Sequence, residues 1–126
     1  MLLWFKGGSS KLKEIKYDYS KFKRLGKGKY SQEENDFRNE IEKDKNVIYL
    51  FYKIDGNNKE CLYIGETSTT LKERCYTHSK KERDEFWCKK GNCVYILPLG
   101  DIIDNFTRRA MEALLIGSIR PTYNKK

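Results

Sequence analysis

Two apolar runs separated by a short turn constrain the fold of this chain more than any other feature. The first run covers residues 47–54 and is rich in β-branched and aromatic side chains, and the second covers residues 60–65. Between them, Asp55-Gly56-Asn57-Asn58 supplies the Asp-Gly pair that favours a tight turn. The sequence therefore predicts an antiparallel β-hairpin over residues 47–65.

A helix and a third strand are predicted after this hairpin. A run from residue 71 to about residue 86 carries Leu71, Cys75 and His78 at helical spacing, directly after a threonine. Residues 93–98 are largely β-branched and apolar, and their final proline should end the strand or place it at a sheet edge.

A last helix is predicted from Asp104 or Asn105, either of which can cap it, to about Ile119, where Pro121 stops it. The residues that share one of its faces are Phe106, Ala110, Leu114 and Gly117. The order strand, strand, helix, strand, helix predicts an α+β domain over residues 47–126, with a small antiparallel three-stranded sheet flanked by helices.

Residues 1–46 are predicted to form a basic N-terminal arm and a short helix. Between residues 6 and 29 the chain carries nine Lys and Arg but only two acids. Ser31 and Glu34 have the spacing of a capping box, in which each side chain bonds the backbone of the other residue. Phe37 and Ile41 would form the buried stripe of the helix that follows.

The charge of the chain favours a polyanionic partner. Its 126 residues include 26 Lys and Arg and 18 Asp and Glu, which gives a net charge of +8. Aromatic side chains stand between the cations of the arm, where they could stack on bases or pack behind phosphate contacts. The residues expected to bind DNA, most simply as a duplex, are Lys11, Lys13, Lys16, Lys21, Lys23, Arg24, Lys27 and Lys29. The alternative is a solvated basic segment anchored by its aromatic residues.

The sequence favours an intracellular, cytoplasmic protein. The opening apolar run of residues 1–5 is shorter than the core of a signal peptide, and no later run is long enough to span a membrane. In that compartment the four cysteines are reduced thiols or metal ligands rather than disulfides. A zinc site made by Cys75, His78, Cys88 and Cys93 is one alternative, although the loose spacing between its two halves favours reduced thiols.

With these elements in place, residues 47–124 resemble the GIY-YIG nuclease family. Val47-Ile48-Tyr49 stands where the first tripeptide belongs, with valine in place of glycine, and Tyr63-Ile64-Gly65 is the second tripeptide intact. The further matches, in chain order, are Arg74, His78, Glu112 and Asn124. Glu66 departs from the family pattern, because members often carry lysine after the second tripeptide.

The resemblance implies a site for phosphodiester hydrolysis. Glu112 would hold one Mg²⁺ or Mn²⁺, since a hard cation can use one carboxylate together with water and phosphate oxygens. The alternative for Glu112 is an ion pair with Arg108 or Arg109 on the same helix. Arg74 would contact the scissile phosphate and stabilise the charge of the transition state.

The resemblance also implies roles for the remaining matched residues. Tyr49 would act as general base or position the attacking water, with Tyr63 beside it, if its phenolate is favoured by a nearby cation. The alternative for both tyrosines is packing within the strands. His78 would hold the water or relay protons, and Asn124 would orient its neighbours through side-chain hydrogen bonds.

We therefore expect a metal-dependent DNA endonuclease, of a restriction-like or mobile-element type. One active site cuts one strand, so double-strand cleavage would need a homodimer or two visits. The alternatives are a non-catalytic nucleic-acid-binding module that keeps the fold, a structure-specific repair nuclease, and the catalytic part of a longer chain.

Overall fold

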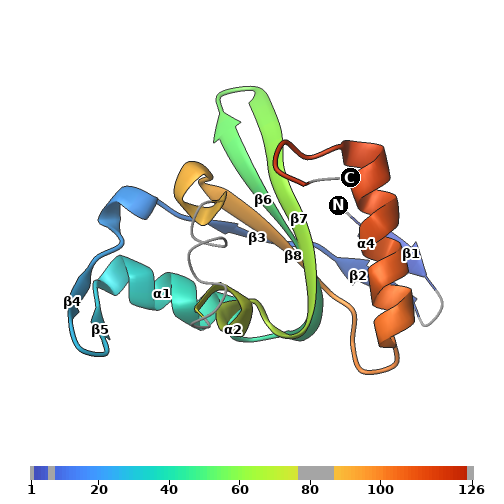
Figure 1. Cartoon of the computed structure of the whole chain (residues 1–126), viewed down its shortest axis with the longest axis horizontal. Coiled ribbons are helices and arrows are strands. Elements are labelled where there is room, and N and C mark those ends of the chain that lie inside the picture. Colours follow the sequence, from blue (N-terminus) through green and yellow to red (C-terminus); the bar gives the residue numbers. More distant parts are fainter. Residues whose placement is uncertain (1, 6–7, 77–86, 125–126) are drawn as a thin grey trace.

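A four-stranded antiparallel sheet forms the centre of the computed structural model, which describes residues 2–5, 8–76 and 87–124, with side chains from residue 12 onward. The strands are β3 (Lys13–Lys16), β6 (Lys45–Asp55), β7 (Asn58–Thr70) and β8 (Cys93–Pro98), in the order β3-β8-β6-β7 (Figure 1). The predicted α+β class is confirmed, but the sheet has four strands instead of three.

The additional strand, β3, comes from the predicted basic arm. It pairs antiparallel with β8, and Ile15 lies opposite Val94. Ile15 is buried, but every other residue of β3 is charged. A single apolar residue among charges gives too weak a strand pattern to recognise in the sequence. Pro98 ends β8 as predicted, although β3 on its outer side makes β8 an inner strand.

The predicted hairpin is confirmed as β6 and β7, which both extend beyond the apolar runs. Asp55 pairs with Asn58 across the turn, where Gly56 has a φ of 61° that glycine adopts without strain. On its other side β6 pairs with β8, so that Tyr49 lies opposite Ile96. The residues of β6 are therefore held by neighbours on both sides.

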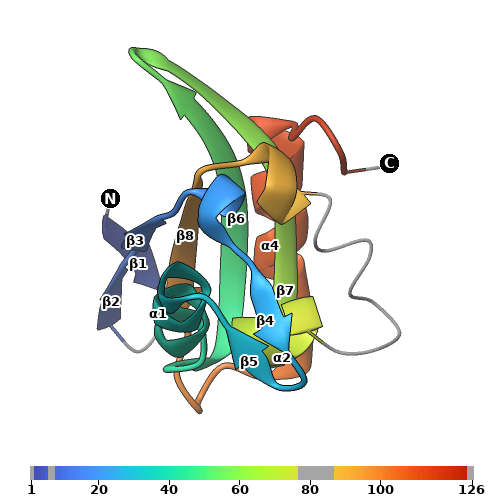
Figure 2. The same cartoon turned by 90° about the vertical axis from the view of Figure 1, so that its left-hand side faces the viewer.

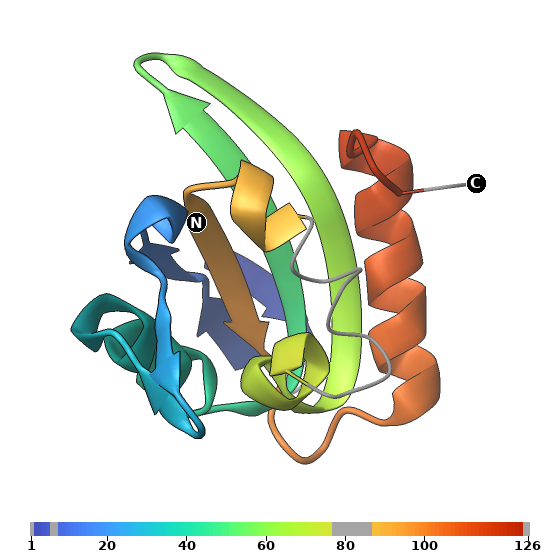
Figure 3. The same cartoon turned by 60° about the vertical axis from the view of Figure 1, so that its left-hand side comes forward.

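Helices cover both faces of the sheet, as the views in Figure 1 and Figure 3 show. On one face α1 (Gln32–Ile41) and α2 (Leu71–Tyr76) share a core with Tyr49. On the other face α4 (Asn105–Ile119) shares a core with Leu50. Successive side chains of β6 therefore enter two different cores, as the pleat of a strand requires.

The capping box predicted before α1 is formed only in part. Ser31 Oγ accepts a hydrogen bond from the Glu34 backbone N–H at 3.3 Å. The Ser31 N–H, however, donates to the carbonyl of Lys23, so it needs no bond from Glu34. The Glu34 carboxylate is buried and accepts from the Tyr76 hydroxyl at 3.0 Å, which ties α1 to α2.

The segment before β6 packs into the same core as the sheet. Phe37 and Ile41 are both buried, as their spacing predicted. The rings of Tyr17 and Phe22 pack on Phe37, with centroid distances of 4.7 and 5.1 Å. The short elements of this segment are β1 (Leu2–Phe5), β2 (Gly8–Lys11), the 3-10 helix η1 (Tyr19–Lys21), β4 (Arg24–Gly26) and β5 (Lys29–Tyr30).

Helix α4 begins after Asp104, whose carboxylate accepts from the Thr107 N–H, and ends at Ile119. The predicted face of this helix points away from the sheet, because Phe106 is 80% exposed and Leu114 is 74% exposed. Apolar residues stand on both sides of α4, and spacing alone does not select the side that packs. Within the described residues, no helix has the length and apolar composition needed to cross a membrane.

Candidate active site

Tyr49 and Gly65, from the two tripeptides, lie opposite each other on β6 and β7. Tyr49 is 1% exposed, and its ring lies over Gly65. A Cβ atom added to Gly65 would fall within 2.6 Å of Tyr49 Cε2, closer than such atoms approach. Glycine is therefore required in the second tripeptide because the tyrosine of the first occupies the space of a side chain.

Tyr63 is held between two aromatic neighbours. Its ring centroid lies 6.3 Å from that of Tyr49 and 3.7 Å from that of Trp87, on which it stacks with an interplanar angle of 12°. Trp87 is buried, and the sequence patterns gave it no role. Stacking of this kind fixes the ring plane of Tyr63.

Asn124 binds the backbone of the second tripeptide. Its Nδ2 donates to the Ile64 carbonyl and its Oδ1 accepts from the Ile64 N–H, both at 2.8 Å. The Thr122 N–H donates to the Cys61 carbonyl at 3.0 Å, so the end of the chain runs beside β7. Both amide atoms of Asn124 are therefore engaged in holding the strand that carries Tyr63.

Arg74 on α2 and Glu112 on α4 belong to elements that pack from opposite faces of the sheet, but their charges interact. Glu112 is half-buried, and burial is the main reason that its pKa is raised. The negative charge of Glu66 raises this pKa further, whereas Arg74, Arg108 and Arg109 lower it. The charge of Arg74 is thus one of three arginine charges that act on the carboxylate predicted to hold a metal.

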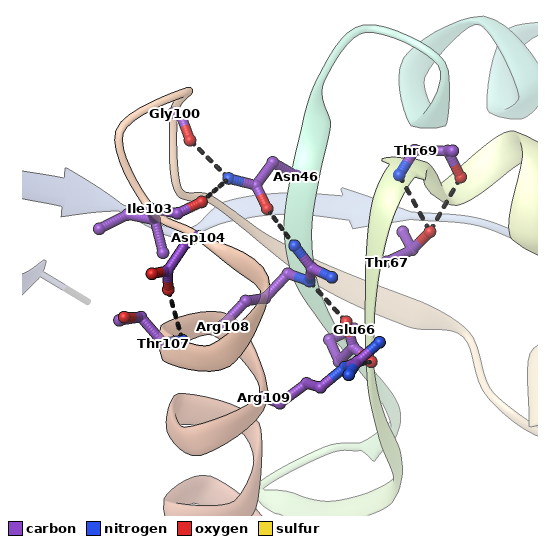
Figure 4. A network of polar contacts seen from close by, with 10 residues as sticks. All are labelled: Asn46, Glu66, Thr67, Thr69, Gly100, Ile103, Asp104, Thr107, Arg108 and Arg109. Atoms are coloured by element: carbon purple, nitrogen blue, oxygen red, sulfur yellow. Dashed lines mark hydrogen bonds and ion pairs between the residues drawn. The ribbon is translucent and has the colours of Figure 1, made fainter.

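A buried network of hydrogen bonds joins α4 to the hairpin of β6 and β7, as Figure 4 shows. The Arg108 side chain is 4% exposed; its Nε donates to Glu66 Oε1 and its Nη1 donates to Asn46 Oδ1 at 2.7 Å. The Asn46 amide nitrogen donates to the carbonyls of Gly100 and Ile103, in the loop before α4. One arginine therefore connects β6, β7 and α4 beside Glu112.

The same network bears on the ion-pair alternative for Glu112. Arg109 Nε lies 3.9 Å from Glu66 Oε2, so both arginines that precede Glu112 on α4 pair with Glu66. No ion pair joins Glu112 to any residue in the described ranges. The predicted alternative, a helical ion pair within α4, is therefore not formed there.

Asn46, Glu66 and Arg108 were missed as parts of a site by the sequence patterns. One signal could have identified Arg108: it shares a helical face with Met111 and Leu115, which pack toward the sheet. An arginine on a buried face needs a counter-charge, and Glu66 was already noted as a departure from the family pattern. Asn46, in a left-handed conformation with φ of 57°, gave no such signal.

Two predicted groups fall wholly or partly outside the described residues. His78 lies in the range 77–86, so its expected place beside Arg74 stays a prediction. Of the cysteines in the alternative zinc site, Cys75 and Cys88 lie in one buried core, and Cys93 Sγ lies 3.8 Å from Glu14 Oε2. Within the described ranges, no three His, Cys, Asp or Glu side chains are arranged to hold a metal ion.

The cations predicted to bind nucleic acid are divided between two places. Lys13 and Lys16 lie on the edge strand β3, where Lys13 Nζ pairs with Asp44 at 2.5 Å; the side chain of Lys11 is outside the described part. The others lie on or beside the β4 and β5 hairpin and are exposed: Lys21, Lys23, Arg24, Lys27 and Lys29.

Glu112 is the carboxylate that the family resemblance assigns to a divalent cation. It is half-buried, burial and Glu66 raise its pKa although Arg74, Arg108 and Arg109 lower it, and its oxygens carry no hydrogen bond from a described residue. A bound cation would offset the cost of that burial. One carboxylate leaves most coordination positions to water and phosphate oxygens, which suits Mg²⁺ or Mn²⁺. The donor set therefore fits the predicted metal.

A comparison with protein families agrees with this arrangement. The model described as the GIY-YIG catalytic domain matches residues 45–124, which is well over half of the chain. Searches of curated proteins and of solved structures gave no match.

Proposed function

The chain belongs to the GIY-YIG catalytic domain family, a family of nucleases, and on this basis we propose that it is a metal-dependent DNA endonuclease. The observation that carries the proposal is that α2, with Arg74, and α4, with Glu112, both pack on β7, which contains Tyr63-Ile64-Gly65, and that the charge of Arg74 acts on Glu112. A guanidinium for the phosphate and a carboxylate for a hard cation are what phosphodiester hydrolysis requires.

Each site residue has a part in this mechanism. Arg74 binds the non-bridging oxygens of the scissile phosphate with its planar fork and stabilises the charge that builds up there. Tyr49 orients or deprotonates the attacking water, and the ring of Tyr63 lies 6.3 Å from that of Tyr49. Glu112 would hold Mg²⁺ or Mn²⁺, which would supply Lewis acidity at this site.

The remaining parts keep this geometry fixed. Asn124 holds the Ile64 backbone and hence the position of Tyr63. Arg108 holds Glu66 and the start of α4, on which Glu112 stands less than two turns further on. His78 would relay protons between the water and solvent.

The biological type is part of the proposal. A compact nuclease domain with an N-terminal extension suits a restriction-like or mobile-element enzyme, by analogy of fold. Because one site hydrolyses one strand, such an enzyme would act as a homodimer or bind its target twice. It would act in the cytoplasm.

A cleavage assay on supercoiled plasmid tests this function. We expect metal-dependent cutting by the wild type with Mg²⁺ or Mn²⁺, none with EDTA, and a loss of at least about 100-fold in Glu112→Gln and Arg74→Ala. Glu33→Gln, which changes an exposed acid of α1, is the matched control and should cut normally. Linear product would support the homodimer, and open circles alone would support a nickase.

The second candidate is a binding module that keeps the fold without cutting. The net charge of +8 favours it as much as it favours the enzyme. Wild-type protein that binds plasmid, branched and single-stranded DNA but cuts none of them would refute the enzyme and support the module. Cutting of branched substrates alone would indicate a structure-specific repair nuclease.

A further inference from the structure

A short basic hairpin projects from the molecule beside α2. This basic hairpin, residues 23–30, contains β4 and β5, paired through Arg24 with Tyr30 and Gly26 with Lys29. The surrounding residues 21–32 carry five Lys and Arg and no acid. Every residue from Lys23 to Lys29 is exposed, including Leu25, at 66%. Its cations are therefore not used to neutralise acids of the hairpin itself.

The base of the basic hairpin is fixed to α1. Ser31 Oγ donates to the Lys21 carbonyl at 2.8 Å and accepts from the Lys23 N–H at 3.3 Å. The Ser31 N–H donates to the Lys23 carbonyl at 2.7 Å. Ser31, which caps α1, thus also closes the basic hairpin. The base of the hairpin is therefore held in place relative to α1.

A stack of side chains connects the basic hairpin to the helix that carries Arg74. The guanidinium carbon of Arg38 lies 4.1 Å from the ring centroid of Tyr30 and 4.4 Å from that of Tyr76. Tyr30 belongs to β5, whereas Tyr76 is the last residue of α2, two positions after Arg74. This stack therefore fixes the position of the basic hairpin relative to α2, the helix that carries Arg74.

The basic hairpin lies beside the helix that carries Arg74, since the rings of Tyr30 and Tyr76 are in edge contact. In Figure 1 and Figure 3 α2 lies between the basic hairpin and α4, and Figure 2 shows β4 and β5 in front of α1 and α2. A duplex with a phosphate at Arg74 could therefore extend toward the exposed cations at Lys27 and Lys29.

From this geometry we infer that the basic hairpin is a two-stranded ribbon that binds duplex DNA next to the scissile phosphate and positions it in the active site. The inference rests on the proposed function, since it assumes that Arg74 receives a phosphate. The major groove of B-DNA admits a two-stranded ribbon, lysines on it would neutralise phosphates, and an exposed leucine such as Leu25 suits contact with a thymine methyl group.

The salt dependence of binding tests the inference. A fluorescent 30-base-pair duplex would be titrated with Glu112→Gln protein, to prevent cutting, at KCl concentrations from 50 to 300 mM. Lys27→Ala/Lys29→Ala removes two cations of the basic hairpin. The control, Lys53→Ala/Lys59→Ala, removes two exposed lysines of the β6–β7 hairpin, so both doubles have the same net charge.

We expect the slope of log affinity against log salt to be less steep by about 1.8 in the Lys27→Ala/Lys29→Ala variant. Each phosphate contact contributes about 0.9 to the steepness of this slope. The control should change the slope by much less. An unchanged slope in the first double, an equal fall in both, preference for single-stranded DNA or RNA, or no duplex binding would overturn the inference. Duplex binding through the basic hairpin without any cutting by the wild type would instead refute the nuclease and leave this surface in place.

Discussion

Replacing Arg108 with methionine should lower the free energy of unfolding by about 3 kcal/mol. The arginine is the donor to both Glu66 and Asn46, and its side chain is 4% exposed. Removing one partner of a buried ion pair costs about 3–5 kcal/mol, because the other charge stays behind without compensation. The Glu66 side chain is 20% exposed, so water can replace part of the lost contact, which places the effect at the lower end.

The assay is urea unfolding at pH 7, followed by tryptophan fluorescence. With a urea dependence of about 1–3 kcal/mol per molar for a small domain, the midpoint should fall by about 1–3 M. Arg109→Met is the matched control, because that side chain is 68% exposed and should change stability by less than about 0.5 kcal/mol. It removes the same charge from the same helix.

A double-mutant cycle identifies the cause. In Arg108→Met/Glu66→Gln the uncompensated charge is gone, so the double variant should be more stable than the sum of the single effects allows, by at least about 1 kcal/mol. The reasoning would be refuted by Arg108→Met unfolding within about 1 kcal/mol of the wild type, or by additive effects of the two substitutions.

Three further predictions concern the candidate site. Glu66→Gln removes a negative charge that raises the pKa of Glu112, so this pKa should fall. The acidic limb of the pH profile of the cleavage rate should then move to lower pH. A shift of this limb to higher pH would contradict the prediction. Gly65→Ala places a methyl group against the Tyr49 ring, and it should lower the free energy of unfolding by about 1–3 kcal/mol and remove most of the cleavage activity. Thermal unfolding and plasmid cutting measure these two effects. Normal values for both would show that the ring can move aside. Asn124→Asp replaces the donor to the strand carbonyl by an acceptor and should cost about 1–3 kcal/mol in urea, and an unchanged midpoint would mean that these two hydrogen bonds do not hold the strand.

The central elements of the fold could be predicted because their patterns are strong. The hairpin of β6 and β7 has two long apolar runs around an Asp-Gly turn, and α4 has a clear cap at Asp104 and a stop after Ile119. Such signals are local, so they do not depend on which surface the element meets. The fourth strand and the side of α4 that packs are decided by long-range contacts.

The candidate site shows the same division between local patterns and distant contacts. The motifs identified Arg74 and Glu112, which lie on helices of opposite faces of the sheet, and the charge of Arg74 lowers the pKa of Glu112. Arg108, Glu66 and Asn46 are far apart along the chain and belong to no shared motif. Their network forms only because three elements converge, which a one-dimensional pattern does not record.

The pairing of β3 with β8 affects how a shortened form of this domain would behave in solution. The family match begins at residue 45, so β3 lies in the extension that precedes it. A protein trimmed to the matched residues would open the outer edge of β8 and expose a row of backbone donors and acceptors. Other chains could add to that edge as new strands, giving ordered aggregates. The extension therefore covers the edge of the sheet that would otherwise be open to pairing with neighbouring molecules.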